Sequence, residues 1–360
     1  MEHYAGAVAG PHIRQFGKRI YATSPTAIGG LLARAALRYL PAELERKLRQ
    51  MRNGADMVLG GFPSPNDIRW CTRAIARLAP EAVLIDTIFR SPLLAEPELK
   101  ACNSIIIAHD IFHRRAQAMQ AAGYTVQPRD LTRAAEAVLL GRARSIAAIQ
   151  PEEAEIIGAM CPEAHVFTTP MPALPCPPTV QRVPGRLVFV GSAGLPNLDG
   201  MRWFIAEIWP LLAGYGITLD IIGDCGTALR RLPPGVLAHG RVPNLAPFLH
   251  RASLAIAPLR AGSGLKIKLL DYARHGLTTV VTPPALAGFQ ADAAAPFVVA
   301  GSAIMFAEAV RRLVNDPPPP DVALDYCIRH YGQDASFAGL AAALRPENAI
   351  PARQRSESDA

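Results

Sequence analysis

The strongest chemical signal in the chain runs from residue 257 to residue 271, where the sequence reads APLRAGSGLKIKLLD. An apolar strand is expected to end at Ala257, and a Gly-Ser-Gly turn (262–264) to precede a helix beginning near Leu265. Lys266 then falls in the first helical turn, where a cation opposes the helix dipole at a cost of about 0.3–1 kcal/mol. A bound diphosphate would reverse that cost, because backbone N–H groups and the ammonium would meet its negative charge. We therefore predict a diphosphate-binding turn here.

Two further charged residues follow on the same expected helix. Lys268 and Asp271 are three positions apart, so they lie on neighbouring positions of one helix face. Lys268 would extend the phosphate site, and the Asp271 carboxylate could accept hydrogen bonds from two ribose hydroxyls. The alternative interpretation is an ordinary surface ion pair between the two side chains.

Two other strand ends in the second half of the chain carry weaker signals. Gly191 and Ser192 follow the apolar run Arg186–Val190, and a glycine there allows a phosphate to approach the backbone. Asn197, which would cap the next helix, supports the alternative of a plain strand-to-helix turn. After the run Val236–His239, the backbone around Arg241 and Val242 could bind the edge of a base.

In the first half of the chain, the segment after Ser104–Ala108 contains a histidine, His109, at a predicted strand end. Ligands of doubly wound sheets bind at the carboxyl ends of the strands, so His109 is expected at the binding face. Arg114 and Arg115, with His113, begin a predicted helix and could meet phosphate or an anionic acceptor. The alternative for His109 is a purely structural role.

Short apolar runs that alternate with helical stretches must position these residues. Near-continuous apolar strands separated by helices indicate parallel sheets covered on both faces, and Met171–Thr179 holds four prolines that interrupt both kinds of element. We therefore expect an α/β protein with two Rossmann-like, doubly wound domains facing a cleft. Its predicted divisions are residues 1–172, a proline-rich linker at 173–184, a second domain at 185–325, a helical segment at 326–345 and a disordered tail at 346–360. The expected strands are Arg19–Thr23, Asp56–Gly61, Ala82–Thr87, Ser104–Ala108, Ser145–Gln150, His165–Thr168, Arg186–Val190, Ile217–Ile222, Val236–His239, Ser253–Ala257, Thr278–Thr282 and Pro296–Val299.

Composition excludes several classes of protein. The net charge is +7, of which nine Lys/Arg against three Glu place +6 before residue 53, so the chain lacks the overall basic character of a nucleic-acid binder. No apolar run reaches the ~18–20 residues of a membrane span, and the start shows no signal peptide, so a cytoplasmic location is expected. The basic helical pattern at 31–52 predicts either weak peripheral contact with a membrane or an ordinary amphipathic helix. The six scattered cysteines form no C-x-x-C pair and predict no zinc or redox site.

Taken together, the segments VFVGS (188–192), Pro196-Asn197, Gly240-Arg241-Val242 and 257–276 resemble the donor domain of group 1 (family 4) glycosyltransferases. The resemblance runs from about Leu187 to Gly288 and implies the GT-B fold, a nucleotide-sugar donor, retention of anomeric configuration, and neither metal nor cofactor. It implies catalytic roles for His109 and Asp271, ribose or base contacts for Asp271, Arg241 and Val242, and diphosphate contacts for Gly191, Ser192, Ser263, Gly264, Leu265, Lys266 and Lys268.

The chain departs from this family in two places. The family has two glutamates separated by seven residues, and their positions here are held by Ser263 and Asp271, which puts contact with the donor sugar in doubt. The first domain of the family opens with a strand and a glycine-rich turn before the strand expected at Arg19–Thr23. Only eighteen residues precede that strand here, so either the first strand is lost or the true start lies upstream.

The predicted reaction transfers a sugar from a nucleoside diphosphate to the hydroxyl of a glycan or lipid-linked acceptor, as in polysaccharide or glycolipid synthesis. Two alternatives stay open: a sugar-nucleotide epimerase, and a non-catalytic GT-B subunit that binds a nucleotide or a partner transferase. A Rossmann oxidoreductase is disfavoured, because no G-x-G-x-x-G motif follows a predicted strand.

Overall fold

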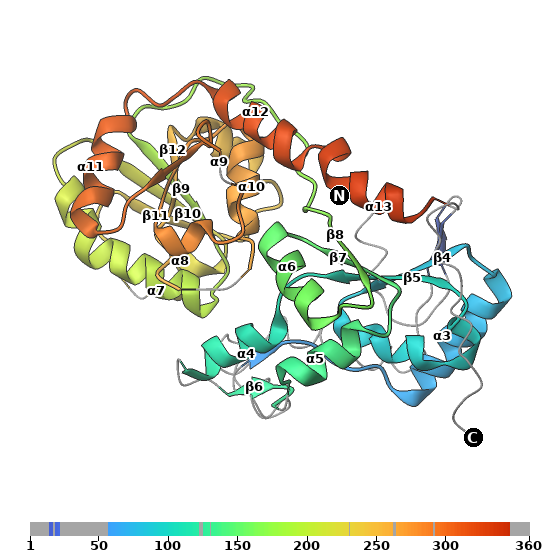
Figure 1. The fold of residues 1–360 in the computed structure, drawn as a ribbon. Coiled ribbons are helices and arrows are strands. Elements are labelled where there is room, and N and C mark those ends of the chain that lie inside the picture. The colour runs from blue at the N-terminus through green and yellow to red at the C-terminus, as the bar shows by residue number, and fades with distance from the viewer. Residues whose placement is uncertain are drawn as a thin grey trace.

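The computed structural model describes the strands 14–16 and 19–21 and residues 57–121, 125–129, 131–229, 231–261, 264–290 and 292–345. Two α/β domains, each built on a parallel sheet, lie side by side in the N- and C-terminal halves of this part of the chain (Figure 1). We call them the N-terminal and the C-terminal domain.

The N-terminal domain is built on a four-stranded parallel sheet with the order β4-β5-β7-β8. Its inner strands bury nearly every side chain because helices cover both faces, which is why they read as continuous apolar runs. A separate parallel pair, β3 with β6, lies beside this sheet. The strands are β3 (Met57–Val58), β4 (Ala82–Asp86), β5 (Asn103–Ala108), β6 (Val126–Gln127), β7 (Ser145–Ala148) and β8 (His165–Thr168).

The helices of this domain begin at local sequence signals. Ser64 caps α3 (Pro65–Leu78) in a capping box with Asp67, with Pro65 at the first helical position. Thr132 caps α5 in the same manner, by accepting a hydrogen bond from the Ala135 N–H. The remaining elements are the 3₁₀ helices η1 (Ile88–Ala95) and η2 (Pro97–Leu99) and the α-helices α4 (Phe112–Ala121), α5 (Arg133–Leu140) and α6 (Pro151–Met160).

The C-terminal domain is built on a six-stranded parallel sheet with the order β11-β10-β9-β12-β13-β14. This is the order of a doubly wound sheet, in which the winding direction reverses between β9 and β12, and ligands bind at the carboxyl ends of the strands at such a point. The strands are β9 (Arg186–Val190), β10 (Thr218–Ile222), β11 (Val236–Gly240), β12 (Leu254–Ala257), β13 (Thr279–Val281) and β14 (Phe297–Val299).

Helices flank this sheet on both faces, with apolar clusters under each layer. Helix α7 lies close to the segment after β12, because a Cβ built on Gly200 would be only 2.4 Å from the carbonyl oxygen of Pro258. The elements are α7 (Leu195–Trp203), the π-helical turn η3 (Phe204–Ile208), the 3₁₀ helices η4 (Trp209–Leu212) and η5 (Pro283–Leu286), and α8 (Asp224–Ala228), α9 (Ala246–Arg251), α10 (Ile267–Arg274) and α11 (Ala303–Leu313).

Two segments connect the domains. The proline-rich stretch after β8 contains neither helix nor strand until β9 begins. The last two helices, α12 (Pro320–Tyr331) and α13 (Gln333–Ala343), lead the chain back from α10 to the N-terminal sheet (Figure 1). There the side-chain amide of Asn103 donates a hydrogen bond to the carbonyl of Ala343. The Ala343 side chain packs with Ile105 and Ala147.

The structure differs from the sequence predictions at a few positions. The strand expected at Arg19–Thr23 is not part of a parallel sheet: β2 (Arg19–Tyr21) pairs antiparallel with β1 (Arg14–Phe16). The division expected between residues 325 and 326 falls inside α12. The helix at 31–52, the question of a lost first strand and the tail at 346–360 lie outside the described residues. None of the helices within the described ranges is long and apolar enough to cross a membrane.

Candidate active site at the carboxyl ends of the strands

Two glycines bring the ends of β9 and β10 into close contact. A Cβ built on Gly223 would lie 2.4 Å from the carbonyl oxygen of Gly191, and Gly223 has a φ of +97° that disfavours other residues. A Cβ on Gly191 would lie 2.7 Å from the Phe189 ring. The Gly191 N–H donates to the carbonyl of Ile222 at 2.9 Å. The backbone at the switch point of the sheet therefore carries no side chain that would block a ligand.

Lys268 projects from the first turn of α10 toward this strand end. Its Nζ lies 2.6 Å from the amide oxygen of Asn197 and 4.1 Å from the centre of the Phe189 ring. Asn197 in turn donates to the carbonyl of Ser192 at 3.0 Å. Burial lowers the pKa of Lys268 to about 7; Cys225 opposes this shift, and the charge of Lys266 adds a smaller contribution to it. The cation is thus positioned by neutral groups.

Lys266 occupies the N-cap position of the same helix. Its Nζ donates to the carbonyl of Gly264 at 2.5 Å. Burial is the main cause that lowers its pKa to about 8, while the carboxylates of Asp110 and Glu153 oppose the shift and Arg115 reinforces it. The two lysines therefore place concentrated positive charge where the helix dipole is also positive.

A buried tyrosine fixes α10 against β9. The Tyr272 side chain is fully buried, and its hydroxyl accepts a hydrogen bond from the N–H of Val190 at 2.7 Å. Burial raises its pKa far above the ordinary value, so the hydroxyl stays neutral. This contact sets the distance between the helix that carries the lysines and the strand that ends at Gly191.

In the N-terminal domain, His109 follows β5 and meets an aspartate at the end of the neighbouring strand. Nε2 of His109 lies 2.6 Å from Oδ1 of Asp86, the last residue of β4. This hydrogen bond is the main cause that lowers the pKa of the Asp86 carboxyl. Both side chains are exposed, so the imidazole is oriented yet reachable from solvent.

The helix that follows His109 is already capped by a buried carboxylate. The side chain of Glu136 on α5 accepts hydrogen bonds from the N–H groups of Phe112 and His113, at 2.9 and 2.7 Å. Nδ1 of His113 lies 2.8 Å from the same carboxylate. The expectation that His113 meets phosphate is therefore wrong, because Glu136 occupies the N-terminus of α4.

The two domains meet next to the lysines. A Cβ built on Gly264 would lie 3.2 Å from Oδ2 of Asp110, so the glycine allows the carboxylate to lie against the turn. A Cβ built on Gly288 would lie only 1.4 Å from Oε1 of Gln150, so this glycine packs directly against the Gln150 side chain. Beside it, burial and the charge of Asp110 raise the pKa of Glu153 to about 7. Within the described part of the chain, Oε1 of Gln150 and Oε2 of Glu153 are buried without a hydrogen-bond partner.

Comparison with known families places the C-terminal half of the chain. Residues 184–316 match the family described as Glycosyl transferases group 1. The C-terminal domain thus matches a group 1 glycosyltransferase domain. The prediction of this family from the residues of the phosphate turn is confirmed.

Solved structures agree with this glycosyltransferase fold over both domains. TarM matches with a TM-score of 0.60 and 11% identity, over 78% of this chain and 58% of TarM. Sucrose-phosphate synthase from Thermosynechococcus elongatus matches with 0.63 and 12%, over 93% and 85%. A UDP-forming trehalose-phosphate synthase from Burkholderia vietnamiensis matches with 0.57 and 12%, over 94% and 89%. The predicted GT-B architecture is thus confirmed, while among curated proteins no sequence matches the chain.

The other predicted residues of this glycosyltransferase domain have the following positions. Asp271 pairs with Arg274 at 3.0 Å and not with Lys268, so the predicted alternative of a Lys268–Asp271 ion pair is wrong. Arg241 forms a bidentate contact with Asp224, at 2.8 and 2.7 Å from Nε. Val242 packs against the apolar cluster that includes Val188 and Leu269. Leu265 packs against the cluster that includes Leu270 and Tyr326, and Ser263 lies outside the described residues.

Of the two arginines predicted to meet phosphate or an acceptor, one pairs with a carboxylate and the other is exposed to solvent. Arg115 binds the buried Asp110 carboxylate at 2.9 Å, whereas Arg114 is exposed on α4. Asp110 is therefore held by one cation of its own domain while it faces Lys266 across the domain contact.

Sequence reasoning missed three functional candidates: Asp86, Asp110 and Glu153. The sequence did contain a signal for Asp86, because this charged residue lies near the end of the apolar run Ala82–Thr87. That run is the predicted strand that precedes the strand leading to His109. Asp110 and Glu153 had none, because their significance comes from the C-terminal domain that packs against them.

Proposed function

We propose that this chain transfers a sugar from a nucleoside diphosphate to an acceptor hydroxyl, with retention and without a metal. The observation that carries this proposal is the pair of desolvated lysines, Lys266 and Lys268, at the switch point of the C-terminal sheet. A cation whose pKa is lowered by burial gains most from a permanent anionic ligand, because the ligand restores the interactions lost with water. A diphosphate of about two negative charges fits that requirement.

On the donor side, each group has one task. The Gly191 backbone allows the diphosphate to approach, and the lysines with the N-terminus of α10 stabilise the charge that develops on the leaving group. Such stabilisation takes the place that a divalent cation has in other transferases. Asp271, one turn along α10, would accept hydrogen bonds from the ribose, for which it must share its carboxylate with Arg274.

On the opposite side, His109 would orient the donor or the acceptor near the reacting carbon. Asp86 holds the imidazole in one orientation through the 2.6 Å contact, so we assign it a positioning role.

Complexes of the structural neighbours support a donor of this type. A point mutant of S. aureus TarM was solved with UDP and alpha-GlcNAc-glycerol, and the pneumococcal O-GlcNAc transferase GtfA with UDP and GlcNAc. By analogy we propose a UDP-sugar as donor and a glycan or lipid-linked hydroxyl as acceptor.

Calorimetry with UDP, GDP, ADP and dTDP on the purified chain tests the donor site first. We expect micromolar affinity for one nucleotide, and UDP is the first candidate. The chain is then incubated with a panel of UDP-sugars, and released UDP is measured with and without sugar-alcohol acceptors. The His109→Gln variant should bind UDP normally, but it should generate UDP from the UDP-sugar about 100-fold more slowly, which is the loss that a misplaced reacting group can cause.

A second candidate, a non-catalytic nucleotide-binding subunit, is favoured by one observation, the serine in place of the first family glutamate at position 263. It predicts the same nucleotide binding without UDP release from any sugar nucleotide. Failure to bind any of the four nucleotides would overturn both candidates.

A further inference from the structure

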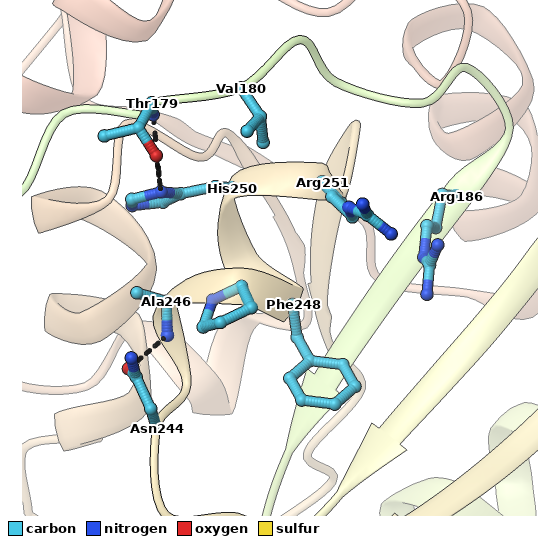
Figure 2. A pocket seen from close by; sticks show the side chains of 9 residues that line it. Thr179, Val180, Arg186, Asn244, Ala246, Phe248, His250 and Arg251 are labelled. Carbon is cyan, nitrogen blue, oxygen red and sulfur yellow. Dashed lines mark hydrogen bonds between the residues drawn. The ribbon is translucent and has the colours of Figure 1, made fainter.

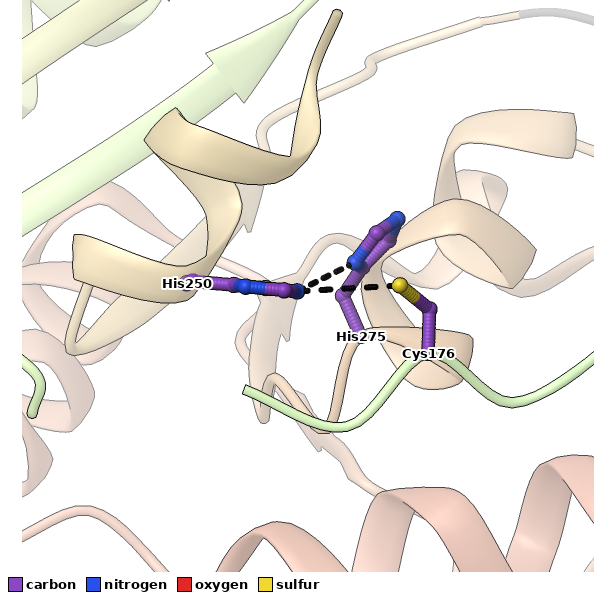
Figure 3. Close-up of side chains that lie close together, drawn as sticks. All are labelled: Cys176, His250 and His275. Atoms are coloured by element: carbon purple, nitrogen blue, oxygen red, sulfur yellow. Dashed lines mark hydrogen bonds between the residues drawn. The ribbon is translucent and has the colours of Figure 1, made fainter. Parts of the chain in front are cut away.

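Three potential metal ligands from distant parts of the chain lie close together at the C-terminal end of α10, the end opposite the lysines. Cys176 belongs to the proline-rich connection, His250 to the last turn of α9, and His275 to the C-cap of α10 (Figure 3). Nε2 of His250 lies 3.0 Å from Nδ1 of His275 and 3.8 Å from Sγ of Cys176. The three ligand atoms all lie within 4.8 Å of one another.

Burial and hydrogen bonds restrict the positions of these three side chains. His250 and His275 are 5% and 2% exposed, so neither ring is free to turn toward solvent. The Cys176 N–H donates to the carbonyl of Arg274 at 2.6 Å, which ties the connection to the end of α10. Nδ1 of His250 lies 3.3 Å from the hydroxyl of Thr179. Among the described residues, Nε2 of His275 is buried without a hydrogen-bond partner.

The spacing of the donor atoms matches a tetrahedral cation site. With zinc–sulfur and zinc–nitrogen distances of about 2.3 and 2.05 Å, adjacent ligands are separated by roughly 3.6 Å for S···N and 3.3 Å for N···N. Two observed separations, 3.8 and 3.0 Å, differ from these values by a few tenths of an ångström, and the third, between Sγ of Cys176 and the ligand nitrogen of His275, lies within 4.8 Å. Side-chain rotations that bring this third separation to the same range would close the site around an ion.

From this geometry we propose that Cys176, His250 and His275 form a binding site for Zn²⁺. One thiolate and two imidazoles are a ligand set that this borderline-soft cation favours over Mg²⁺ or Ca²⁺. Binding releases the proton of the Cys176 thiol, while both imidazoles bind as neutral rings. In the metal-free structure Nδ1 of His250 accepts a hydrogen bond from the Thr179 N–H at 3.4 Å. Metal binding at Nε2 would place the ring proton on Nδ1, which would then donate to the Thr179 hydroxyl at 3.3 Å, the kind of outer partner that zinc-bound histidines commonly have.

A cavity of about 470 Å³ borders the site at His250 (Figure 2). His250 and Thr179 belong to its wall, together with Phe248 and Arg251. A water molecule can supply the fourth ligand of a three-residue zinc site. The bound ion would fasten the interdomain connection to α9 and to the end of α10 opposite the lysines, so it would fix how the donor domain is tethered.

Cobalt substitution tests the proposal on the full-length chain, which is first stripped of metal with a chelator. We expect one Co²⁺ per chain, a thiolate-to-cobalt charge-transfer band, and displacement of the band by Zn²⁺. Cys176→Ser should abolish the band, and His275→Gln should weaken Zn²⁺ binding by more than ~10-fold, since even the loss of an outer partner costs roughly 10–100-fold. Cys102→Ser and His165→Gln, which change the same residue types away from the site, should leave both readouts unchanged.

Two results would overturn the proposal. One is a wild-type chain that shows no charge-transfer band at stoichiometric Co²⁺. The other is a Cys176→Ser variant that keeps the band, which would place the thiolate ligand elsewhere. A melting curve of each metal-free variant shows whether it is folded, and it keeps loss of the site distinct from loss of the fold. Neither measurement depends on nucleotide binding, so the result is separate from that for the donor site.

Discussion

The N-termini of α4 and α10 are two similar places with opposite electrostatics. Each helix begins shortly after a buried parallel strand, β5 or β12, at the face where ligands of such sheets bind. At α4, the buried carboxylate of Glu136 accepts the first N–H groups. At α10, the first turn instead presents Lys268, which contacts a neutral amide and an aromatic ring.

This difference shows that a helix N-terminus at a strand end is not by itself an anion site. What decides is whether the chain supplies the anion. In the N-terminal domain Glu136 completes the local charge balance, so α4 serves as a structural support for the loop that carries His109. In the C-terminal domain positive charge remains in excess, and burial lowers the pKa of both lysines. A ligand with phosphate groups would complete the balance there.

Replacement of Lys268 by methionine is expected to give the largest effect. Met keeps most of the side-chain volume but removes the charge, and hydrogen bonds to charged groups contribute about 1.5–3 kcal/mol each. At ~1.4 kcal/mol per tenfold, UDP affinity measured by calorimetry should fall roughly 10- to 100-fold. The melting temperature without ligand should not fall, because burial of the cation is unfavourable to the folded state.

Arg312→Gln is the matched control for this change, since it removes an exposed cation from α11, a helix with no residue in the candidate site. UDP affinity should stay the same in that variant. If both variants lost affinity to the same extent, the effect would come from the overall charge of the protein. The proposal that Lys268 at the N-terminus of α10 binds the phosphate groups would then be wrong.

The pH dependence of nucleotide binding sharpens the same contrast. In the nucleotide-free protein, Lys268 and Lys266 have pKa values of about 7 and about 8, and a bound diphosphate would raise both pKa values. Binding therefore takes up protons and is strongest below pH 7, and it weakens as pH rises through the pKa values of the free protein. From pH 7 to pH 8 the affinity should fall about tenfold, mostly through Lys268. Calorimetry in buffers of different ionisation enthalpy measures the proton uptake. A wild-type affinity independent of pH in this range would contradict the assignment, and Lys268→Met should lose most of the dependence.

The sequence alone predicted the strands of both main sheets and the helix that carries the two lysines, because both depend on local signals, while phosphate binding at this helix stays a prediction. Apolar runs such as Arg186–Val190 have the length and continuity of buried parallel strands. Gly191 and the lysines near residue 267 sit next to such runs, and the topology then brings these strand ends together. The predicted start near Leu265 was two residues early, because Lys266 is the N-cap.

What could not be predicted were the partners of the charged groups. Lys268 lies three residues before Asp271 and Arg274 lies three residues after it, so the sequence offers two possible ion-pair partners. Because Lys268 packs against Phe189 in the structure, Arg274 is the partner of Asp271. The carboxylate that caps α4 comes from another helix, 24 residues away. The cluster of Cys176 with two histidines joins segments that are 74 and 25 residues apart, so no short ligand spacing in the sequence indicates it.

Glu136→Gln changes the N-terminal side of the comparison. The amide can no longer satisfy all three groups that contact the carboxylate, because its NH₂ faces donors. A buried unsatisfied group costs about 1–3 kcal/mol, so the free energy of unfolding of the N-terminal domain should fall by that amount in urea. UDP affinity should be unchanged. Glu155→Gln, exposed on α6, is the matched control and should have little effect. A loss of UDP affinity without loss of stability would show that this region belongs to the phosphate site.

Arg114→Gln should give the smallest effect and is the most direct test of whether α4 participates in phosphate binding. The side chain is exposed, and single exposed charges contribute about 0–1 kcal/mol, so UDP affinity should change by less than ~5-fold. That small change should also vanish at high salt, because exposed charges are screened over about 10 Å at 0.1 M. A decrease as large as that of Lys268→Met, retained at high salt, would mean that the α4 arginine contacts the ligand directly. Glu136 would then fail to neutralise this end of the helix, and the two helix N-termini would act on one phosphate group from opposite domains.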